Sequence, residues 1–420
     1  MNAAGNSRRA ALDILRAVRA GKIFDQALDE NVQDLEPTDR KLAHEIAAGV
    51  LRSRDALDKT IQPYLKKPSS KTAYDIRDIL RIGTYQMVFL DRIPDYAAVT
   101  SAVELAKELE GKKSAGFVNA VLRKVAEARE AEKPKPEREV SLAETHSHPA
   151  WLVERWITRF GKETTEAILS HNNTRPKLTI QPARWTSEQL LREIERAGID
   201  HAPAPGGRGI VIPDAQVNKI PGFKEGGFVV QDATQRSIVE FLGLPKEARV
   251  WDCCAAPGGK TAALAGTVRA VFASDKGPRR IWRLKKTVDR VCPDVPVFLA
   301  DALFPPIRQD AINCVLVDAP CSATGTMAKH PDARWRITPE RIQKAARTQA
   351  DILDSASRVV PLGGVLAYVT CSLEPEENEL QVEDFLAKHE NFLRIRDDLM
   401  ILPSKDGADG GFAAVFRRNK

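Results

Sequence analysis

The chain has 420 residues, which is too long for one ordinary hydrophobic core and predicts two or three domains. Hydrophobic residues make up 43% of it and charged residues 29%, which excludes a disordered or fibrous protein. Because no apolar run approaches the length of a membrane-spanning helix, we expect no membrane partner. The formal net charge of +6 suits an acidic partner such as nucleic acid without requiring one.

Residues 1–130 are predicted to form an all-α domain, because apolar residues such as Leu42, Ile46 and Val50 recur there at helical spacing. The basic stretch 1–21 could pass for a transit peptide, but its apolar periodicity favours a first helix. Residues 131–145 are polar and charged and include two prolines, so they predict a linker.

The remainder mixes strand and helix patterns. Residues 146–235 predict a small α+β subdomain, and residues 236–420 predict an α/β domain with a mostly parallel, Rossmann-like sheet covered by helices on both faces. In such sheets, ligands bind beyond the carboxyl ends of the strands. The strands predicted for this domain are Arg249–Asp252, Ala270–Ser274, Val297–Leu299, Cys314–Asp318 and Val365–Thr370.

The first cluster of unusual residues joins a strand to a helix through Gly258 and Gly259, which allow a ligand to approach the backbone. A nucleotide-triphosphate loop is excluded, because Cys254 stands where that motif needs glycine. The dinucleotide fingerprint is excluded as well, because Lys260 takes the place of its second glycine.

Carboxylates follow the next two predicted strands. Asp275 ends the first of them, where it can accept hydrogen bonds from ribose hydroxyls, and Asp301 follows the second, where it can face adenine or its ribose. The alternative interpretation is an ordinary glycine-containing turn with surface carboxylates.

Two cysteines also lie just beyond predicted strands: Cys321 follows Asp318, and Cys371 follows Thr370. A single cysteine at such a place is usually structural, but two at matching positions indicate a reactive pair. A redox pair is an alternative that leaves Asp318 unexplained. The chain has six cysteines without zinc-ligand spacing or a disulfide-dense segment, so we expect no metal site and a reducing cytoplasm.

At these clusters the sequence resembles the Nol/Nop/Sun family of RNA cytosine-C5 methyltransferases, and the resemblance extends over essentially the whole chain. Two stretches of the helical part are similar to the NusB-type RNA-binding domain that marks the bacterial RsmB, Sun or Fmu branch, which modifies small-subunit ribosomal RNA. The subdomain before the methylase core would be RRM-like. The matching segments are 24–28, 114–123, 231–235, 254–260, 318–322, 330–335, 370–372 and 410–416.

The resemblance implies S-adenosylmethionine as cofactor, with a pocket lined by Cys254, Ala255, Ala256, Pro257, Gly258, Gly259, Lys260, Asp275, Asp301 and Asp318. It also implies that Cys371 adds to carbon 6 of cytosine, that Cys321 helps to release the product, and that Asp318 contacts the N3/N4 edge. Two residues depart from the family pattern. Ala300 stands where glycine is frequent, which weakens the assignment of Asp301, and Gln181 stands where asparagine is frequent.

Covalent catalysis needs a thiolate, and Lys260 is the predicted cation that would support it. RNA phosphates are predicted to meet the cations of the first helix, with a solvated helix face as the alternative. Trp335 is predicted either to stack on a base beside Arg336 or to pack in a core. The cations in question are Arg8, Arg9, Arg16, Arg19 and Lys22.

Two other functions compete with this interpretation. A non-catalytic RNA-binding factor would rest on the helical domain alone, and it leaves Cys321 and Cys371 without a use. A methyltransferase acting on transfer RNA would keep the same chemistry with another substrate. We expect a monomer, because no additional interaction segment stands out.

Overall fold

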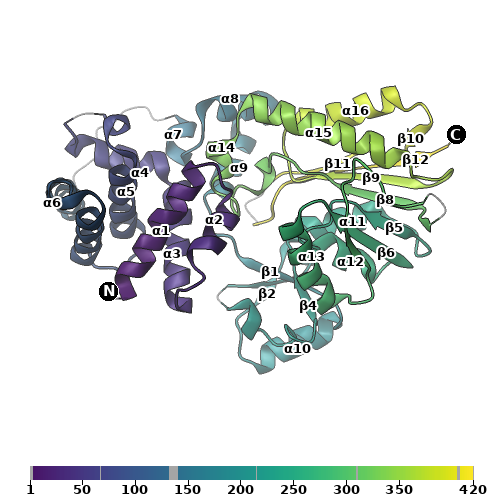
Figure 1. Cartoon of the computed structure of the whole chain (residues 1–420), viewed down its shortest axis with the longest axis horizontal. Coiled ribbons are helices and arrows are strands. Elements are labelled where there is room, and N and C mark those ends of the chain that lie inside the picture. The colour runs from purple at the N-terminus through teal and green to yellow at the C-terminus, as the bar shows by residue number, and fades with distance from the viewer. Residues whose placement is uncertain are drawn as a thin grey trace. The chain divides into compact units, whose positions relative to one another are not determined.

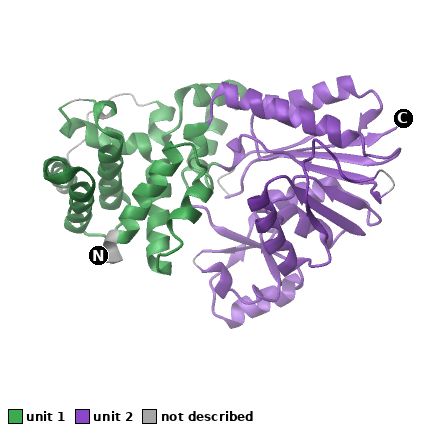
Figure 2. Ribbon diagram, in the orientation of Figure 1, with its two compact units in different colours: residues 1–174, 327–336 green, residues 175–326, 337–420 purple. Residues whose placement is uncertain are grey.

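The computed structural model describes residues 3–66, 68–131, 141–213, 215–308, 311–403 and 407–419. The chain divides into two compact units, shown in Figure 2: residues 1–174 with 327–336, and residues 175–326 with 337–420. Most of the predicted linker, residues 132–140, lies outside the described residues, and its end at 142–145 is helical. The predicted domain boundaries at 130, 145 and 235 stay predictions.

The first unit is helical, and its long helices pack on a continuous apolar core that includes Ile14, Ile46, Ile79 and Leu122. Buried apolar residues on several helices meet in this core, which is how most helices in proteins gain their stability. Its helices are α1 (Ala3–Arg19), α2 (Phe24–Asn31), α3 (Pro37–Arg52), α4 (Arg54–Ile61), α5 (Tyr74–Phe89), α6 (Asp95–Glu130), α7 (Leu142–His146), α8 (Ala150–Phe160) and α9 (Lys162–Asn172).

The same unit contains a short segment from much later in the chain, Met327–Arg336, which carries helix α14 (Ala333–Arg336). Arg334 is fully buried there: its Nη1 donates to Asn173 Oδ1 at 2.6 Å, and its Nη2 donates to the Asn172 carbonyl at 2.8 Å. Asp332 is buried as well and accepts a bond from the Phe24 N–H. The segment is therefore an internal part of the helical unit.

The second unit begins with a small antiparallel sheet of order β2-β3-β1-β4. Helix α10 starts with a capping box in which the Thr186 side chain and Gln189 bond to each other's backbone N–H. Ile180, Leu190 and Phe228 share the apolar core of this part. The elements are β1 (Leu178–Pro182), α10 (Ser187–Arg196), β2 (Ala202–Pro203), β3 (Ile210–Ile212) and β4 (Phe228–Val230).

The larger sheet of this unit has the order β10-β12-β9-β8-β5-β6-β7, with β11 paired to β12. The strands from β9 to β7 are parallel, and β12 runs antiparallel to its neighbours. The strands are β5 (Arg249–Asp252), β6 (Ala270–Asp275), β7 (Val297–Leu299), β8 (Cys314–Asp318), β9 (Val365–Thr370), β10 (Phe392–Arg394), β11 (Leu399–Ile401) and β12 (Gly411–Arg418).

Helices cover both faces of this sheet, as expected for strands that are apolar along their whole length. Figure 1 shows α11, α12 and α13 on one face and α15 and α16 on the other. They are α11 (Ala233–Leu242), α12 (Gly259–Ala265), α13 (Pro278–Val291), α15 (Pro339–Ser357) and α16 (Glu379–Lys388). The predicted combination of a helical domain, a small α+β part and a Rossmann-like domain is confirmed. Among the described residues, no helix is long and apolar enough to span a bilayer.

Candidate active site

The strand order brings the predicted site residues to one edge of the large sheet. Asp275 ends β6 and Asp318 ends β8, while Cys371 follows β9 directly. These strands and β5 between them are parallel neighbours, so their carboxyl ends lie in a row. Asp301 lies two residues beyond the end of β7, the outermost strand of the row.

The turn after β5 depends on Gly258, whose φ of +107° lies in a region that disfavours side chains. A Cβ at this position would also come within 3.1 Å of Leu284 Cδ1 on α13. Gly259 then begins α12. The backbone of this turn is therefore fixed closely against α13.

Asp275 is buried, and its carboxylate accepts hydrogen bonds from a backbone N–H and from a side chain. The Ala256 N–H donates to Oδ2 at 3.3 Å, and Arg280 Nε lies 2.8 Å from Oδ1 and 2.9 Å from Oδ2. The turn after β5 and the carboxylate after β6 are thus joined, and a ribose hydroxyl would share Asp275 with Arg280. Asp301 accepts a local bond from the Leu303 N–H at 3.1 Å.

Lys260 and Asp318 form an ion pair across the ends of β5 and β8, with Nζ 2.7 Å from Oδ2. The Lys260 side chain is only 10% exposed, which strengthens the attraction between the two charges. The predicted role of Lys260 beside a thiolate therefore needs revision, because its ammonium is directed to this carboxylate.

The two cysteines beyond β8 and β9 are in contact. The Sγ atoms of Cys321 and Cys371 lie 2.9 Å apart, and the Cys371 N–H donates to Cys321 Sγ at 3.3 Å. The hydrogen bond to Cys371, together with burial, raises the pKa of the Cys321 thiol well above its ordinary value. Cys321 is therefore protonated near neutral pH.

Both cysteine loops are held by Glu377, which sequence analysis did not identify as a site residue. Its carboxylate is fully buried and accepts bonds from the Ser322 N–H at 2.8 Å, from Gln349 Nε2 at 2.9 Å and from the Ser372 hydroxyl. Burial raises the pKa of Glu377, and the surrounding donors oppose that shift. Its place six residues after Cys371, beyond the end of β9, is the sequence feature that could have identified it.

Asp252 and Gln231 are two more buried polar residues beside the turn after β5. Asp252 Oδ2 accepts a bond from the Thr261 hydroxyl at 2.7 Å, but Oδ1 has no partner among the described residues. Burial raises the pKa of Asp252 to about 7. Both amide atoms of Gln231 are also without a described partner, and its Nε2 would lie 3.5 Å from a Cβ at Gly259.

These orphaned atoms indicate a polar ligand, since buried polar groups are normally hydrogen-bonded. S-adenosylmethionine carries an ammonium and hydroxyl groups that donate, and a carboxylate that accepts. The Gln231 amide, the Asp275 carboxylate and the open turn at Gly258 supply both kinds of partner. The residues present therefore fit this cofactor.

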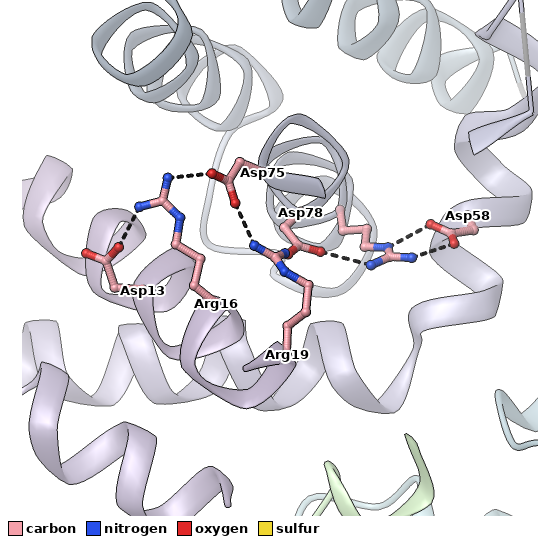
Figure 3. Close-up of polar contacts among 7 residues, drawn as sticks. Asp13, Arg16, Arg19, Asp58, Asp75 and Asp78 are labelled. Carbon is pink, nitrogen blue, oxygen red and sulfur yellow. Dashed lines mark hydrogen bonds and ion pairs between the residues drawn. The ribbon is translucent and has the colours of Figure 1, made fainter. Parts of the chain in front are cut away.

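Arg16 and Arg19 of α1 form ion pairs with carboxylates of the same chain. Figure 3 shows Arg16 directed to Asp13 and Asp75, and Arg19 directed to Asp75 and Asp78. Arg16 Nη2 and Arg19 Nη2 each lie 2.7 Å from an Asp75 oxygen. The helical unit thus satisfies these charges with its own carboxylates.

The other three cations that we predicted to meet RNA are also engaged. Arg8 is buried and donates to Gln86 Oε1 at 2.8 Å. Arg9 pairs with Asp13 and Glu108, and Lys22 pairs with Glu30. The prediction that these residues contact RNA phosphates consequently has little support.

Trp335 lies in the helical unit, where it packs against the apolar core. Its Nε1 donates to the Leu51 carbonyl at 2.7 Å, and the Arg54 guanidinium lies 4.5 Å from the centre of its ring. Arg336 Nε bonds to Asp332 at 2.6 Å. The core-packing alternative is confirmed for Trp335.

Two clefts lie in the second unit away from the predicted cofactor residues. One of about 740 Å³ is lined by the amino end of β6, by the residues just before β7, and by Arg184 and Arg269. Another of about 530 Å³ lies beside β2, β3 and α10. Neither of these two clefts is lined by a predicted cofactor residue.

Comparison with known families divides the chain into three matched regions. Residues 239–417 match the family described as 16S rRNA methyltransferase RsmB/F. Residues 5–127 match the NusB family, and residues 148–217 match the ferredoxin-like domain of RsmF/B-like methyltransferases. The fold and these matches agree on the type of each part.

Solved structures support the fold. The crystal structure of PH0851 has a TM-score of 0.80 at 24% identity and covers 100% of this chain and 99% of its own. The structure of NSun6 from Pyrococcus horikoshii with SFG has a TM-score of 0.56 at 18% identity and covers 65% of this chain and 98% of its own.

Relatives match along nearly the whole chain. A probable ribosomal RNA small subunit methyltransferase B of Synechocystis sp. is 34% identical, with 92% of this chain and 90% of the relative covered. The ribosomal RNA small subunit methyltransferase B of Vibrio cholerae is 32% identical, with 98% of each covered. On the strength of these matches and of the three domain types, the chain belongs to the ribosomal RNA small subunit methyltransferase B family.

Proposed function

We propose that this enzyme methylates carbon 5 of a cytosine in small-subunit ribosomal RNA, with Cys371 as nucleophile and Cys321 assisting product release. The observation that carries the proposal is the 2.9 Å contact between the two sulfur atoms at neighbouring strand ends. The resemblance to RNA cytosine-C5 methyltransferases gives the two cysteines these roles, and the family membership supports the RNA substrate.

Methyltransferases of this family use S-adenosylmethionine, which supplies an electrophilic methyl group. The residues that would hold it are Gln231, the turn at Cys254–Lys260, Asp275, Asp301 and Asp318. The ion pair of Lys260 with Asp318 keeps both side chains at the end of the sheet. The carboxylate of Asp318 would then accept a hydrogen bond from the N4 amino group of cytosine.

Cys371 would act as a thiolate, which is the nucleophilic form of cysteine. Its sulfur forms a bond to carbon 6, and the electron pair of the 5,6 double bond becomes available at carbon 5 for the methyl group. The neighbouring Cys321 supports this step, because its raised pKa keeps it protonated and able to donate a hydrogen bond to the thiolate.

Release requires removal of the proton from carbon 5, reformation of the double bond and departure of the Cys371 sulfur as thiolate. Cys321 is suited to accept that proton. The main cause of its raised pKa is the bond to Cys371, and this cause disappears once the Cys371 sulfur has become a thioether. Cys321 then gives up its own proton to solvent water more readily, and the resulting thiolate can accept the proton from carbon 5.

The test uses wild type, Cys321→Ala and Cys371→Ala with a small-subunit ribosomal RNA transcript and methyl-labelled S-adenosylmethionine. Denaturing gels separate labelled RNA from covalent protein–RNA adducts. We expect Cys321→Ala to accumulate the adduct, because release is blocked, and Cys371→Ala to give neither adduct nor labelled RNA. Methylation by Cys371→Ala would refute the assigned roles.

Separated RNA pools distinguish the substrates. Labelling of transfer RNA in preference to the ribosomal transcript would favour the alternative substrate, and transfer to no RNA would favour a binding factor. The proposal also includes action in the cytoplasm as a monomer, which sedimentation of the enzyme and cell fractionation would test.

A further inference from the structure

One short segment of this chain carries a large local excess of positive charge. Residues 276–290 contain seven Lys or Arg and one Asp, so their net charge of +6 equals that of the whole chain. Most of the segment forms α13 (Pro278–Val291). Arg279, Lys285 and Lys286 are exposed on this helix, and Lys276 is exposed just before it. Such a local excess of charge attracts polyanions.

An aromatic residue lies among these cations. Trp282 is 64% exposed, and Lys286 Nζ lies 5.3 Å from the centre of its ring. Positions 279, 282 and 286 have the spacing of one helix face, and the apolar Leu284 and Val288 face the core instead. We call Arg279, Trp282 and Lys286 the α13 outer face.

The helix connects two parts of the second unit. It begins three residues after Asp275, at the edge of the sheet that carries the candidate active site. Its last turn contacts the segment around β4, because Arg290 Nη1 donates to the carbonyls of Phe223 at 3.1 Å and Phe228 at 2.8 Å. The α13 outer face, from residue 279 to residue 286, thus extends for about 10 Å away from the active-site edge.

We propose that the α13 outer face binds single-stranded RNA beside the target cytosine, with Trp282 stacking on a base and Arg279 and Lys286 contacting phosphates. The inference rests on the proposed RNA substrate and adds the surface that holds it. Single-stranded RNA suits this surface, because unpaired bases can stack on an exposed aromatic ring while the backbone lies along cations.

The experiment measures the affinity of the full chain for a short fluorescein-labelled strand of small-subunit ribosomal RNA by fluorescence anisotropy, without cofactor, over a range of salt concentrations. The same strand annealed to its complement serves as the duplex probe. The variants are Trp282→Ala, Trp282→Phe and Lys286→Gln. The control is Lys344→Gln, which makes the same charge change on α15, on the opposite face of the sheet.

We expect Trp282→Ala to weaken single-strand binding about tenfold, because one stacked base is lost, and Trp282→Phe to keep most of the affinity. Duplex binding should change little. Lys286→Gln should lower the slope of log affinity against log salt by about 0.7, the value for one phosphate contact on a single strand. Lys344→Gln should bind like wild type, and all variants should melt at the wild-type temperature.

The inference fails if wild type binds the strand while Trp282→Ala binds it with unchanged affinity and salt slope. It also fails if Lys344→Gln weakens binding as much as Lys286→Gln, because charge alone would then explain the effect. Neither result touches the proposed methylation, which the cysteine variants test separately. If wild type binds no RNA at all, both the α13 outer face and the RNA substrate are wrong.

Discussion

Glu377 binds Ser322 through both of its carboxylate oxygens: the Ser322 N–H donates to Oε1 at 2.8 Å, and the Ser322 hydroxyl donates to Oε2. Ser322 directly follows Cys321, so this pair of bonds fixes the backbone of the first cysteine loop. The hydroxyl of Ser372, which follows Cys371, donates to the same Oε2. One buried side chain therefore sets the positions of both sulfur atoms.

Replacement of Glu377 by alanine should destabilise the protein by about 3 kcal/mol, because several buried donors lose their acceptor at once. Urea unfolding of the purified protein measures this loss. Methyl transfer should fall as well, since the cysteine loops lose their common anchor. Gln349→Ala, which removes one of the donors and keeps the carboxylate, is the matched control and should have the smaller effect. Wild-type stability of Glu377→Ala would contradict this account.

Asp252 should make stability depend on pH. Its pKa is raised to about 7 in the folded protein, above the ordinary 3.8, so the folded state holds the proton more tightly than the unfolded state does. The stabilisation of the folded state that comes from this proton is complete below the pKa of Asp252 in the unfolded chain. It is lost as the pH rises toward 7, and it stays lost above pH 7. Asp252→Asn keeps an acceptor for Thr261 and removes the titration.

The free energy of unfolding of Asp252→Asn relative to wild type should consequently rise between pH 4 and 7, by a few kcal/mol at most. Unfolding in urea at several pH values gives this difference, in which the other titrating groups cancel. A constant difference across that range would show that Asp252 does not titrate there.

Mild oxidation should join Cys321 to Cys371. Their sulfur atoms lie 2.9 Å apart, and a disulfide-forming reagent that accepts two electrons would remove both thiol protons. We expect loss of methyl transfer, a mass decrease of two hydrogens and full recovery with excess dithiol. Cys314→Ser, at a buried cysteine elsewhere in the sheet, should oxidise like wild type, whereas Cys321→Ala should not form the bond.

Arg334 should be important for the helical unit although it lies far along the chain. Its guanidinium is fully buried among the carbonyls of Arg52, Ser147 and Asn172 and the side chain of Asn173. Arg334→Lys keeps the charge but loses the planar array of donors, so unfolding in urea should show a loss of about 2–4 kcal/mol. Arg341→Lys, at an exposed position of α15, should change stability by less than about 0.5 kcal/mol.

The α1 cations should matter for stability rather than for RNA. Asp75→Asn weakens the ion pairs with Arg16 and Arg19, and should reduce the free energy of unfolding by about 1 kcal/mol, because these side chains are partly exposed. The hydrogen bond from Arg16 lowers the pKa of Asp75, so this stabilisation is present above pH 3.8 and is lost as the pH falls through the folded value. RNA affinity should not decrease, and anisotropy with the single-stranded probe checks this.

Local sequence signals were sufficient for the parts of the fold that depend on chain-neighbouring residues. The strands at Arg249–Asp252, Val297–Leu299 and Cys314–Asp318 coincide with the predicted ones, because each is a short apolar run with a turn signal or carboxylate at its end. The strand predicted at Val365–Thr370 coincides as well. Which of the site residues bind the cofactor and which act on the cytosine remains a prediction.

Partners far apart in sequence could not be predicted in this way. Nothing near Glu377 indicates that its carboxylate meets Ser322, and Arg16 is as basic in sequence as any RNA-binding arginine until Asp75 is brought beside it. Lys260 was likewise assigned to a thiolate, because the sheet register that brings it to Asp318 is not visible in the motif. The partners of Glu377, Arg16 and Lys260 are all determined by packing between segments that are far apart in the sequence.

The insertion of Met327–Arg336 into the helical unit has a consequence for synthesis on the ribosome. The residues up to Thr174 emerge first, but the buried positions of Asp332 and Arg334 stay empty until residue 336 has also been made. At elongation rates of roughly 5–20 residues per second, that interval is about 8–30 s. During this interval, the nascent helical unit would expose the carbonyls that later accept hydrogen bonds from Arg334. The helical unit can therefore be completed only after much of the catalytic part has been translated.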